Sequence, residues 1–268
     1  MKVVVVVLVV LFLLYLLSTR GRREHPEMKN LRGWSYAHRG LHGSGCPENS
    51  MAAFRKALNR GYGIELDIHL LADGNLAVLH DSGLKRITGA EGRIEDLTVD
   101  QLKGFRLDGT EETIPEFRQV LEMIAGRVPL IIELKSVGKN YAALCSKACQ
   151  MMDGYKGAYC MESFDPRCLL WLKKHRPDVI RGQLTEDYFK TNGLLSPVMK
   201  FLLTHQMLNF MTIPDFVAYR YEHSRNFSNW IVRKIWRVQG VTWTLRSNAD
   251  YNAAVENGWI PIFENFTP

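Results

Sequence analysis

The residues best suited to chemistry lie in one short stretch, 63–70, where acidic and aliphatic side chains alternate. Side chains alternate across a β-strand, so Glu65, Asp67 and His69 share one face and three aliphatic residues share the other. Two carboxylates at this spacing are costly to bury without a positive partner, and a divalent cation supplies one. The pattern therefore predicts a buried strand with a cation at its polar face and His69 as a candidate to support the ligands.

A second stretch, 130–135, repeats this pattern and places Glu133 and Lys135 on one face at the end of a predicted strand. Glu133 adds a third carboxylate, and three carboxylates suit Mg²⁺ or Ca²⁺ better than zinc. The alternative is a network of ion pairs in which Lys135 and Arg39 neutralise the same carboxylates. Spacing alone leaves both interpretations open.

Two histidines, His38 and His80, each close a β-rich run. Cleaving a phosphodiester requires one group that deprotonates the nucleophile and another that protonates the leaving oxygen, and paired histidines do both near neutral pH. Arg39 follows His38 and could bind two phosphoryl oxygens at once. A single histidine is more often a structural residue, but two beside a carboxylate cluster favour catalysis.

Short β-rich runs alternate with helical patterns along most of the chain, and this alternation predicts a TIM (β/α)₈ barrel of the α/β class. An open, doubly wound sheet is the alternative, although no G-x-G-x-x-G follows the first run. Residues 81–114 are too long for one loop, so we expect a small insertion after the second strand. The predicted strands are 34–38, 63–70, 129–135, 157–162, 179–184, 207–213, 239–245 and 259–263.

The first residues of the chain are strongly apolar between Lys2 and Arg20. As a helix this run reaches about 25 Å, and we expect residues 1–19 to form a transmembrane helix that precedes the barrel. A cleavable signal peptide is the alternative, but no small-residue cleavage site follows. Residues 20–32 are expected to be a basic linker, and residues 33–268 the barrel domain.

Charge is concentrated at the N-terminus, because residues 1–32 carry six Lys or Arg against two Glu while the whole chain has a net charge of +6. The nearly neutral body argues against nucleic acid as a partner. The arginines after the apolar run predict a single-pass protein of the cell membrane with its catalytic body in the cytoplasm. Five cysteines without metal-site spacing favour free thiols in a reducing compartment.

Between residues 36 and 135 the motifs follow an order that resembles the glycerophosphodiester phosphodiesterase family. The ordered series is more specific than any single motif. The matching motifs are His38-Arg39-Gly40, Pro47-Glu48-Asn49-Ser50, Glu65-Leu66-Asp67, Asp73-Gly74, His80-Asp81, Asp96-Leu97-Thr98, Ile114-Pro115 and Glu133-Leu134-Lys135.

The resemblance implies a TIM barrel with an insertion after strand 2, which agrees with the count of elements. It implies one divalent cation, Mg²⁺ or Ca²⁺, and a role for each of eight residues. These are Glu65, Asp67 and Glu133 as metal ligands, His38 and His80 as the acid/base pair, and Arg39, Lys135 and Trp243 as substrate-binding residues. The chain departs from the family at 260–266, where a Thr-Asp or Thr-Asn pair is usual.

The expected activity is therefore metal-dependent hydrolysis of glycerophosphodiesters to glycerol 3-phosphate and an alcohol. In the family the glycerol 2-hydroxyl is thought to attack phosphorus, and water then opens the cyclic phosphate. Three alternatives remain: a lysophospholipase D acting on membrane lysophospholipids, a lyase that stops at the cyclic phosphate, and a non-catalytic membrane-bound scaffold.

Overall fold

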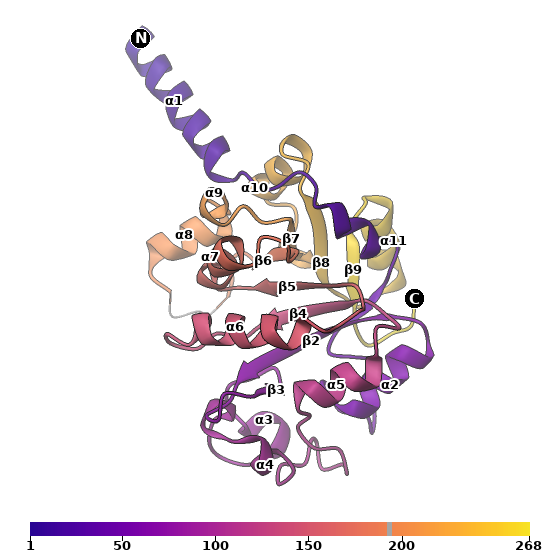
Figure 1. The fold of residues 1–268 in the computed structure, drawn as a ribbon. Coiled ribbons are helices and arrows are strands. Elements are labelled where there is room, and N and C mark those ends of the chain that lie inside the picture. Colours follow the sequence, from indigo (N-terminus) through magenta and orange to yellow (C-terminus); the bar gives the residue numbers. More distant parts are fainter. Residues whose placement is uncertain (192–194) are drawn as a thin grey trace.

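The computed structural model describes residues 1–191 and 195–268, and it contains a closed barrel of parallel strands (Figure 1). The sheet runs β1-β9-β8-β7-β6-β5-β4-β2 and closes through the pairing of β1 with β2, while β3 (Leu76–Val78) adds to β2 in antiparallel fashion. The predicted TIM barrel is confirmed. Its strands are β1 (Tyr36–Ala37), β2 (Gly63–Leu70), β4 (Leu130–Leu134), β5 (Tyr159–Ser163), β6 (Arg181–Thr185), β7 (Phe216–Arg220), β8 (Gln239–Leu245) and β9 (Ile260–Phe263).

One predicted strand is wrong. The run 207–213 contains a short helix, α9 (Asn209–Thr212), and the strand of this unit is β7, which begins at Phe216. Short apolar runs have no period that separates a buried strand from a buried helix. Here Pro214 and Asp215 separate α9 from the strand, and the true strand carries the β-favouring residues Phe216 to Tyr219.

Helices surround the barrel, and polar caps set where several of them begin (Figure 1). A side-chain oxygen at the N-cap accepts a backbone N–H of the first turn at Ser50, Asp165, Ser196 and Ser247. These caps fix the strand-to-helix connections and hence the loops at the barrel mouth. The helices are α2 (Met51–Asn59), α5 (Phe117–Ile124), α6 (Tyr141–Met152), α7 (Pro166–His175), α8 (Pro197–Thr204), α10 (Phe227–Trp230) and α11 (Asn248–Glu256).

The expected insertion, 81–114, lies between β3 and α5 and has a small core of its own. It contains α3 (Lys85–Thr88), a 3-10 turn (Ile94–Asp96) and α4 (Val99–Leu102). Nine buried side chains form this core, which is separate from the two clusters of the barrel. They are Leu71, Ala77, Leu79, Leu84, Ile87, Ile94, Leu102, Leu107 and Ile114.

The first helix, α1 (Lys2–Ser18), projects away from the barrel (Figure 1). It has 17 residues, which at 1.5 Å per residue gives about 25 Å, short of the roughly 30 Å hydrocarbon core. Within the part of the chain that the structure describes, no helix is both long and apolar enough to cross a membrane. The predicted transmembrane helix at 1–19 and the predicted single-pass membrane location with a cytoplasmic body are therefore wrong.

Residues 20–32, expected to be a linker, pack against the amino-terminal end of the barrel. The Arg22 backbone N–H donates to the Pro214 carbonyl at 2.8 Å, and Arg22 Nε lies 3.0 Å from Asp215 Oδ1. Met28 and Leu31 are buried in the cluster of side chains that fills this end. The segment therefore acts as a plug that closes the barrel.

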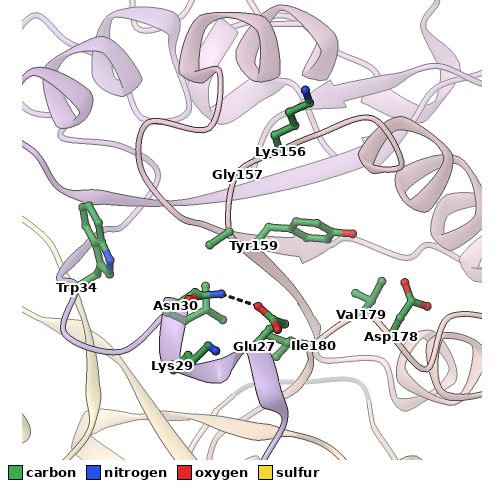
Figure 2. A pocket seen from close by; sticks show the side chains of 12 residues that line it. Glu27, Lys29, Asn30, Trp34, Lys156, Gly157, Tyr159, Asp178, Val179 and Ile180 are labelled. Carbon is green, nitrogen blue, oxygen red and sulfur yellow. Dashed lines mark hydrogen bonds between the residues drawn. The ribbon is translucent and has the colours of Figure 1, made fainter.

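A cleft of about 590 Å³ separates this plug from the residues that precede β5 and β6 (Figure 2). Its wall includes Trp34, Lys156 and Tyr159, and Asn30 Nδ2 donates to Glu27 Oε2 at 2.6 Å on the plug side. Because active sites of such barrels lie at the opposite, carboxyl-terminal end, this cleft is not where we expect the chemistry.

The plug should contribute to stability through Met28. Met28→Ala removes a fully buried side chain, so it should lower the free energy of unfolding by about 2–5 kcal/mol. Lys29→Ala is the matched control, because Lys29 is exposed on the same turn and should change stability by less than about 0.5 kcal/mol. Urea unfolding measures both, and equal midpoints would show that the plug is not part of the folded core.

Candidate active site

Three carboxylates meet inside the carboxyl-terminal end of the barrel. Glu65 and Asp67 project from β2 and Glu133 from β4, where Asp67 and Glu133 are register partners. One oxygen of each lies within 4.8 Å of the others, and each residue is at most 7% exposed. The alternation of β2 therefore does what its pattern predicts, because it turns both acids inward and the aliphatic residues toward the helices.

The electrostatics of this cluster favour a cation. Burial raises the pKa of Glu65, with repulsion from Asp67 adding to it, and burial raises the pKa of Glu133 to about 7. Burial also opposes ionisation of Asp67, but Lys135, His80, Arg39 and the Asn49 hydrogen bond together outweigh it and hold the pKa of Asp67 well below its usual range. Three oxygen donors this close together could bind a divalent cation of the hard, oxygen-preferring kind.

Two side-chain cations already lie at the cluster. Lys135 Nζ is 3.0 Å from Asp67 Oδ1 and 2.7 Å from Glu133 Oε1. Arg39 Nε is 3.6 Å from Asp67 Oδ2. The ion-pair network considered from the sequence is thus present, yet it does not exclude a metal, because Arg39 also pairs with a fourth carboxylate, Glu48, at 2.9 Å.

The turn after β1 aims the main chain of Arg39 at the cluster. Arg39 has φ of 54° and Gly40 has φ of 80°, both in the left-handed region. A Cβ on Gly40 would lie 2.9 Å from the Ala53 backbone, so glycine is required there. The turn lets the Arg39 N–H donate to Glu65 Oε2 at 2.9 Å, which ties β1 to the carboxylates.

The motif at 47–50 supports the same site with three successive side chains. Glu48 holds the Arg39 guanidinium, and Asn49 Nδ2 donates to Asp67 Oδ2 at 2.7 Å. Ser50 caps α2 by accepting the Ala53 N–H. The motif therefore fixes the Arg39 guanidinium, the Asp67 carboxylate and the start of α2.

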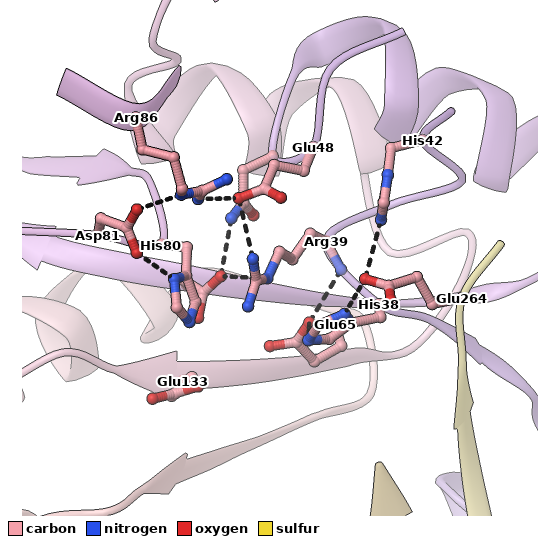
Figure 3. A network of polar contacts seen from close by, with 12 residues as sticks. His38, Arg39, His42, Glu48, Glu65, His80, Asp81, Arg86, Glu133 and Glu264 are labelled. Carbon is pink, nitrogen blue, oxygen red and sulfur yellow. Dashed lines mark hydrogen bonds and ion pairs between the residues drawn. The ribbon is translucent and has the colours of Figure 1, made fainter. Parts of the chain in front are cut away.

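Both predicted histidines reach this end of the barrel, and each is held in the same way (Figure 3). His38 Nδ1 lies 2.8 Å from Glu264 Oε1, and His80 Nδ1 lies 2.6 Å from Asp81 Oδ1. Asp81 is in turn paired with Arg86 of the insertion. A carboxylate on Nδ1 leaves Nε2 of each ring for other partners.

Burial favours the neutral form of both imidazoles. It lowers the pKa of His80 to about 4 and lowers that of His38, in each case against the opposing effect of the nearby carboxylates. A neutral imidazole that donates from Nδ1 carries its lone pair on Nε2, which is the form that can accept a proton. The Nδ1 contacts therefore select a base-competent tautomer at both positions.

His69 follows Asp67 on β2 and supports the site indirectly. It is buried on β2, with Nδ1 2.8 Å from Glu95 Oε1 and Nε2 3.2 Å from the His80 carbonyl oxygen. Glu95 also accepts from Ser82 at 2.6 Å. His69 thus joins β2 to the insertion and steadies the backbone that carries His80.

Trp243 stands on β8 at the other side of the mouth. Its Nε1 donates to the Ala218 carbonyl at 3.1 Å, and its ring packs edge-to-face against Phe164 with centroids 5.6 Å apart. The Arg220 guanidinium lies 6.0 Å from its ring centroid. These contacts form an aromatic wall apart from the carboxylates.

Several site residues were missed from the sequence, and Glu162 is the most deeply buried of them. It lies on β5 as the register partner of Glu133, and Oε2 has no hydrogen-bond partner among the described residues. Burial raises its pKa, and the three carboxylates of the cluster raise it further. A single acid in the strand sequence 159–163 gave no signal, because only the register places it beside Glu133. His42 was also missed. Glu48 and Asp81 lie in the matching motifs and Glu264 in the departing segment 260–266, but no role was predicted for them or for Arg86.

Comparison with known proteins identifies the family. The model of the glycerophosphoryl diester phosphodiesterase family matches residues 38–267, which include the whole cluster. The chain belongs to that family. The family and the class of enzyme, a phosphoric diester hydrolase, that the motifs predicted are thereby confirmed.

Relatives of this phosphodiesterase-family chain include two named glycerophosphodiester phosphodiesterases. One from Bacillus altitudinis is 35% identical over 163 residues, covering 57% of this chain and 66% of the relative. One from Caldanaerobacter subterraneus is 34% identical over 173 residues, covering 60% and 68%. The alignments span about two thirds of each relative.

Solved structures share the fold of this phosphodiesterase-family barrel. A phosphodiesterase from Oleispira antarctica, determined with the product sn-glycerol-3-phosphate, has a TM-score of 0.70 at 20% identity and covers 86% of this chain and 92% of that one. A glycerophosphodiester phosphodiesterase from Parabacteroides distasonis has a TM-score of 0.68 at 25% identity, covering 87% and 92%.

The buried carboxyl of Glu162, whose Oε2 has no hydrogen-bond partner within 1–191 and 195–268, predicts an unusual response to mutation. Glu162→Gln keeps the shape but removes the carboxyl, so in chelator at pH 7.5 it should raise the free energy of unfolding by about 1–3 kcal/mol. Because the folded pKa of Glu162 is above its unfolded value, the wild type loses stability relative to the variant as pH rises. The gain should therefore shrink at pH 5.

Exposed Glu122→Gln is the control and should leave stability unchanged at both pH values. Thermal melts in EDTA measure all three proteins. A Glu162→Gln variant that is less stable than wild type at pH 7.5 would show that the carboxylate has a partner in solution.

Proposed function

We propose that the chain hydrolyses glycerophosphodiesters to glycerol 3-phosphate and an alcohol, with one divalent cation, Mg²⁺ or Ca²⁺. The observation that carries the proposal is the placement of two neutral histidines, His38 and His80, each oriented through Nδ1, at the end of the barrel that holds three buried carboxylates. Family membership and the relatives' names support the same reaction class.

The two histidines would share the proton transfers. One Nε2 takes the proton of the glycerol 2-hydroxyl as its oxygen bonds to phosphorus, and the other ring gives a proton to the departing alcohol oxygen as the P–O bond breaks. Water then opens the cyclic phosphate with the roles reversed, giving glycerol 3-phosphate. A neutral ring suits the base, whereas the ring that acts as the acid must first take up a proton on Nε2. The carboxylate at its Nδ1 stabilises that imidazolium.

The positive side chains would hold the phosphate. Among the described residues, Arg39 Nε has no hydrogen-bond partner, so it can donate to a non-bridging oxygen while Glu48 fixes Nη1. Lys135 lies on the same side of the cluster through its contacts to Asp67 and Glu133. A cation held by the three carboxylates would supply further neutralisation of the phosphoryl charge.

Trp243 and Phe164 would form the wall against the glycerol carbons. Their edge-to-face packing and the hydrogen bond of the Trp243 indole fix a flat apolar surface beside the polar cluster. A substrate with one anionic phosphate and a short carbon chain matches a site that has a polar cluster on one side and an apolar aromatic wall on the other.

A second candidate substrate is a lysophospholipid. A lysophospholipase D from Rattus norvegicus is 32% identical over 133 residues, covering 45% of this chain and 41% of that protein. Turnover of glycerophosphocholine beside lysophosphatidylcholine separates the two candidates. A strong preference for the lipid would replace the water-soluble diester as the substrate, with the same catalytic residues.

The reaction is tested on the full chain with glycerophosphocholine. Glycerol 3-phosphate release should require Mg²⁺ or Ca²⁺, stop in EDTA, and fall about 10²–10⁴-fold in His38→Ala, because an acid/base group is removed. A coupled glycerol 3-phosphate dehydrogenase assay measures the product, and phosphorus NMR detects any cyclic phosphate that accumulates.

His175→Ala is the matched control, since His175 is an exposed histidine on α7. It should keep wild-type turnover. Release that continues undiminished in EDTA, or in folded His38→Ala, would contradict the mechanism. Accumulation of the cyclic phosphate would instead identify a lyase, and a folded wild type with no turnover of either substrate would favour a non-catalytic scaffold.

A further inference from the structure

Glu264 occupies the position where the last strand ends, within the segment that departs from the family pattern. Its two carboxylate oxygens serve different partners. Oε1 lies 2.8 Å from His38 Nδ1 and 3.3 Å from His42 Nε2, whereas Oε2 accepts from Arg246 Nε at 3.0 Å and lies 2.8 Å from Nη2. The Glu264 side chain is only 10% exposed, whereas the Arg246 side chain is half exposed.

We propose that Glu264 is the positioning residue that fixes the His38 ring, holding its proton on Nδ1 and turning Nε2 toward the metal-ligating carboxylates. The inference rests on the proposed function for its meaning in catalysis. The geometry on which it is based does not depend on that function. His38 Nε2 lies 3.9 Å from Glu65 Oε2, and His38 Nδ1 contacts Glu264 Oε1.

The direction of the hydrogen bond follows from charge. A carboxylate only accepts, so the shared hydrogen must belong to His38 Nδ1 as long as Glu264 is ionised. Burial opposes that ionisation, but the hydrogen bond from His38, the nearby His42 and the charge of Arg246 together outweigh it and keep the pKa of Glu264 well below its usual range. Glu264 is therefore a fixed acceptor.

Arg246 fixes the Glu264 carboxylate through its second oxygen, Oε2. Two of its nitrogens reach Oε2, and it also lies 3.6 Å from Glu222 Oε1. Glu222 pairs with Arg220 at 3.3 Å, and Arg220 pairs with Glu186 at 3.1 Å. The position of Glu264 is thus tied to the loops that follow β6, β7 and β8.

The second histidine shows the same arrangement with different residues. His80 Nδ1 contacts Asp81, and Asp81 contacts Arg86, which also pairs with Glu48 (Figure 3). Each histidine is therefore backed by a carboxylate and each carboxylate by an arginine. For His80 all three lie within seven residues, whereas for His38 the carboxylate comes from the opposite end of the chain.

The position of the proton tests the proposal without any activity. In the full chain labelled with ¹⁵N-histidine at pH 7.5, long-range ¹H–¹⁵N spectra identify which ring nitrogen carries hydrogen, and His38→Ala assigns the signal. We expect Nδ1–H in wild type and in Glu264→Gln, which keeps an acceptor, and a shift to Nε2–H in Glu264→Leu. An Nε2 proton in wild type, or an unchanged tautomer in Glu264→Leu, overturns the proposal.

Kinetics give the second arm. Glu264→Leu should lower kcat for glycerophosphocholine about 10²-fold, with KM changed less than about threefold, because substrate contacts remain and proton transfer is lost. Glu264→Gln should restore most of that loss. Glu256→Leu, an exposed glutamate on α11, is the control and should match wild type.

Equal losses in the Gln and Leu variants, or a loss confined to KM, would show that Glu264 does not orient the base. Melting temperatures exclude loss of the fold as the cause. Should wild type release no glycerol 3-phosphate, the proposed function fails, and the spectra alone decide whether Glu264 fixes His38.

Discussion

The cost of holding three carboxylates together inside the mouth of a barrel is the constraint on which the rest of the site depends. Glu65, Asp67 and Glu133 face one another from neighbouring strands and are almost fully buried. Burial by itself opposes their ionisation. The fold answers with Lys135 and Arg39 and with hydrogen bonds from main-chain and amide N–H groups. These donors leave part of the negative charge of the carboxylates unbalanced, and the carboxylate oxygens line a position suited to a divalent cation.

That constraint explains why the surrounding loops have so little freedom. The left-handed turn at Arg39 and Gly40 brings a backbone N–H to Glu65. The motif at 47–50 binds both Arg39 and Asp67. On the other side, His69 fastens the insertion to β2. The elements that carry the two histidines are thus attached to the strands that carry the carboxylates, so the proposed acid/base groups and the proposed cation ligands keep fixed relative positions.

The sequence predicts the parts of this structure that are local and periodic. Residues 63–70 and 239–245 match β2 and β8, since the former alternates strictly and the latter is rich in β-favouring residues. It fails where the deciding contact is distant or the pattern is ambiguous. The run 207–213 has no period that excludes a helix, and Glu162 joins the site only through its register with Glu133. The length of α1 differs from the thickness of a membrane's hydrocarbon core by only a few ångströms, so the apolar run alone is a weak basis for predicting a membrane span.

Glu264 illustrates the same limit and its mechanistic consequence. It lies 226 residues from His38, and only the pairing of β1 with β9 that closes the barrel brings the two together. The longer side chain of glutamate, compared with aspartate, lets one carboxylate reach a histidine and an arginine on opposite sides. Barrel closure and the orientation of His38, the proposed base, are therefore linked. A break at the β1–β9 seam would separate His38 from Glu264, whereas the contact of His80 with Asp81 does not cross that seam.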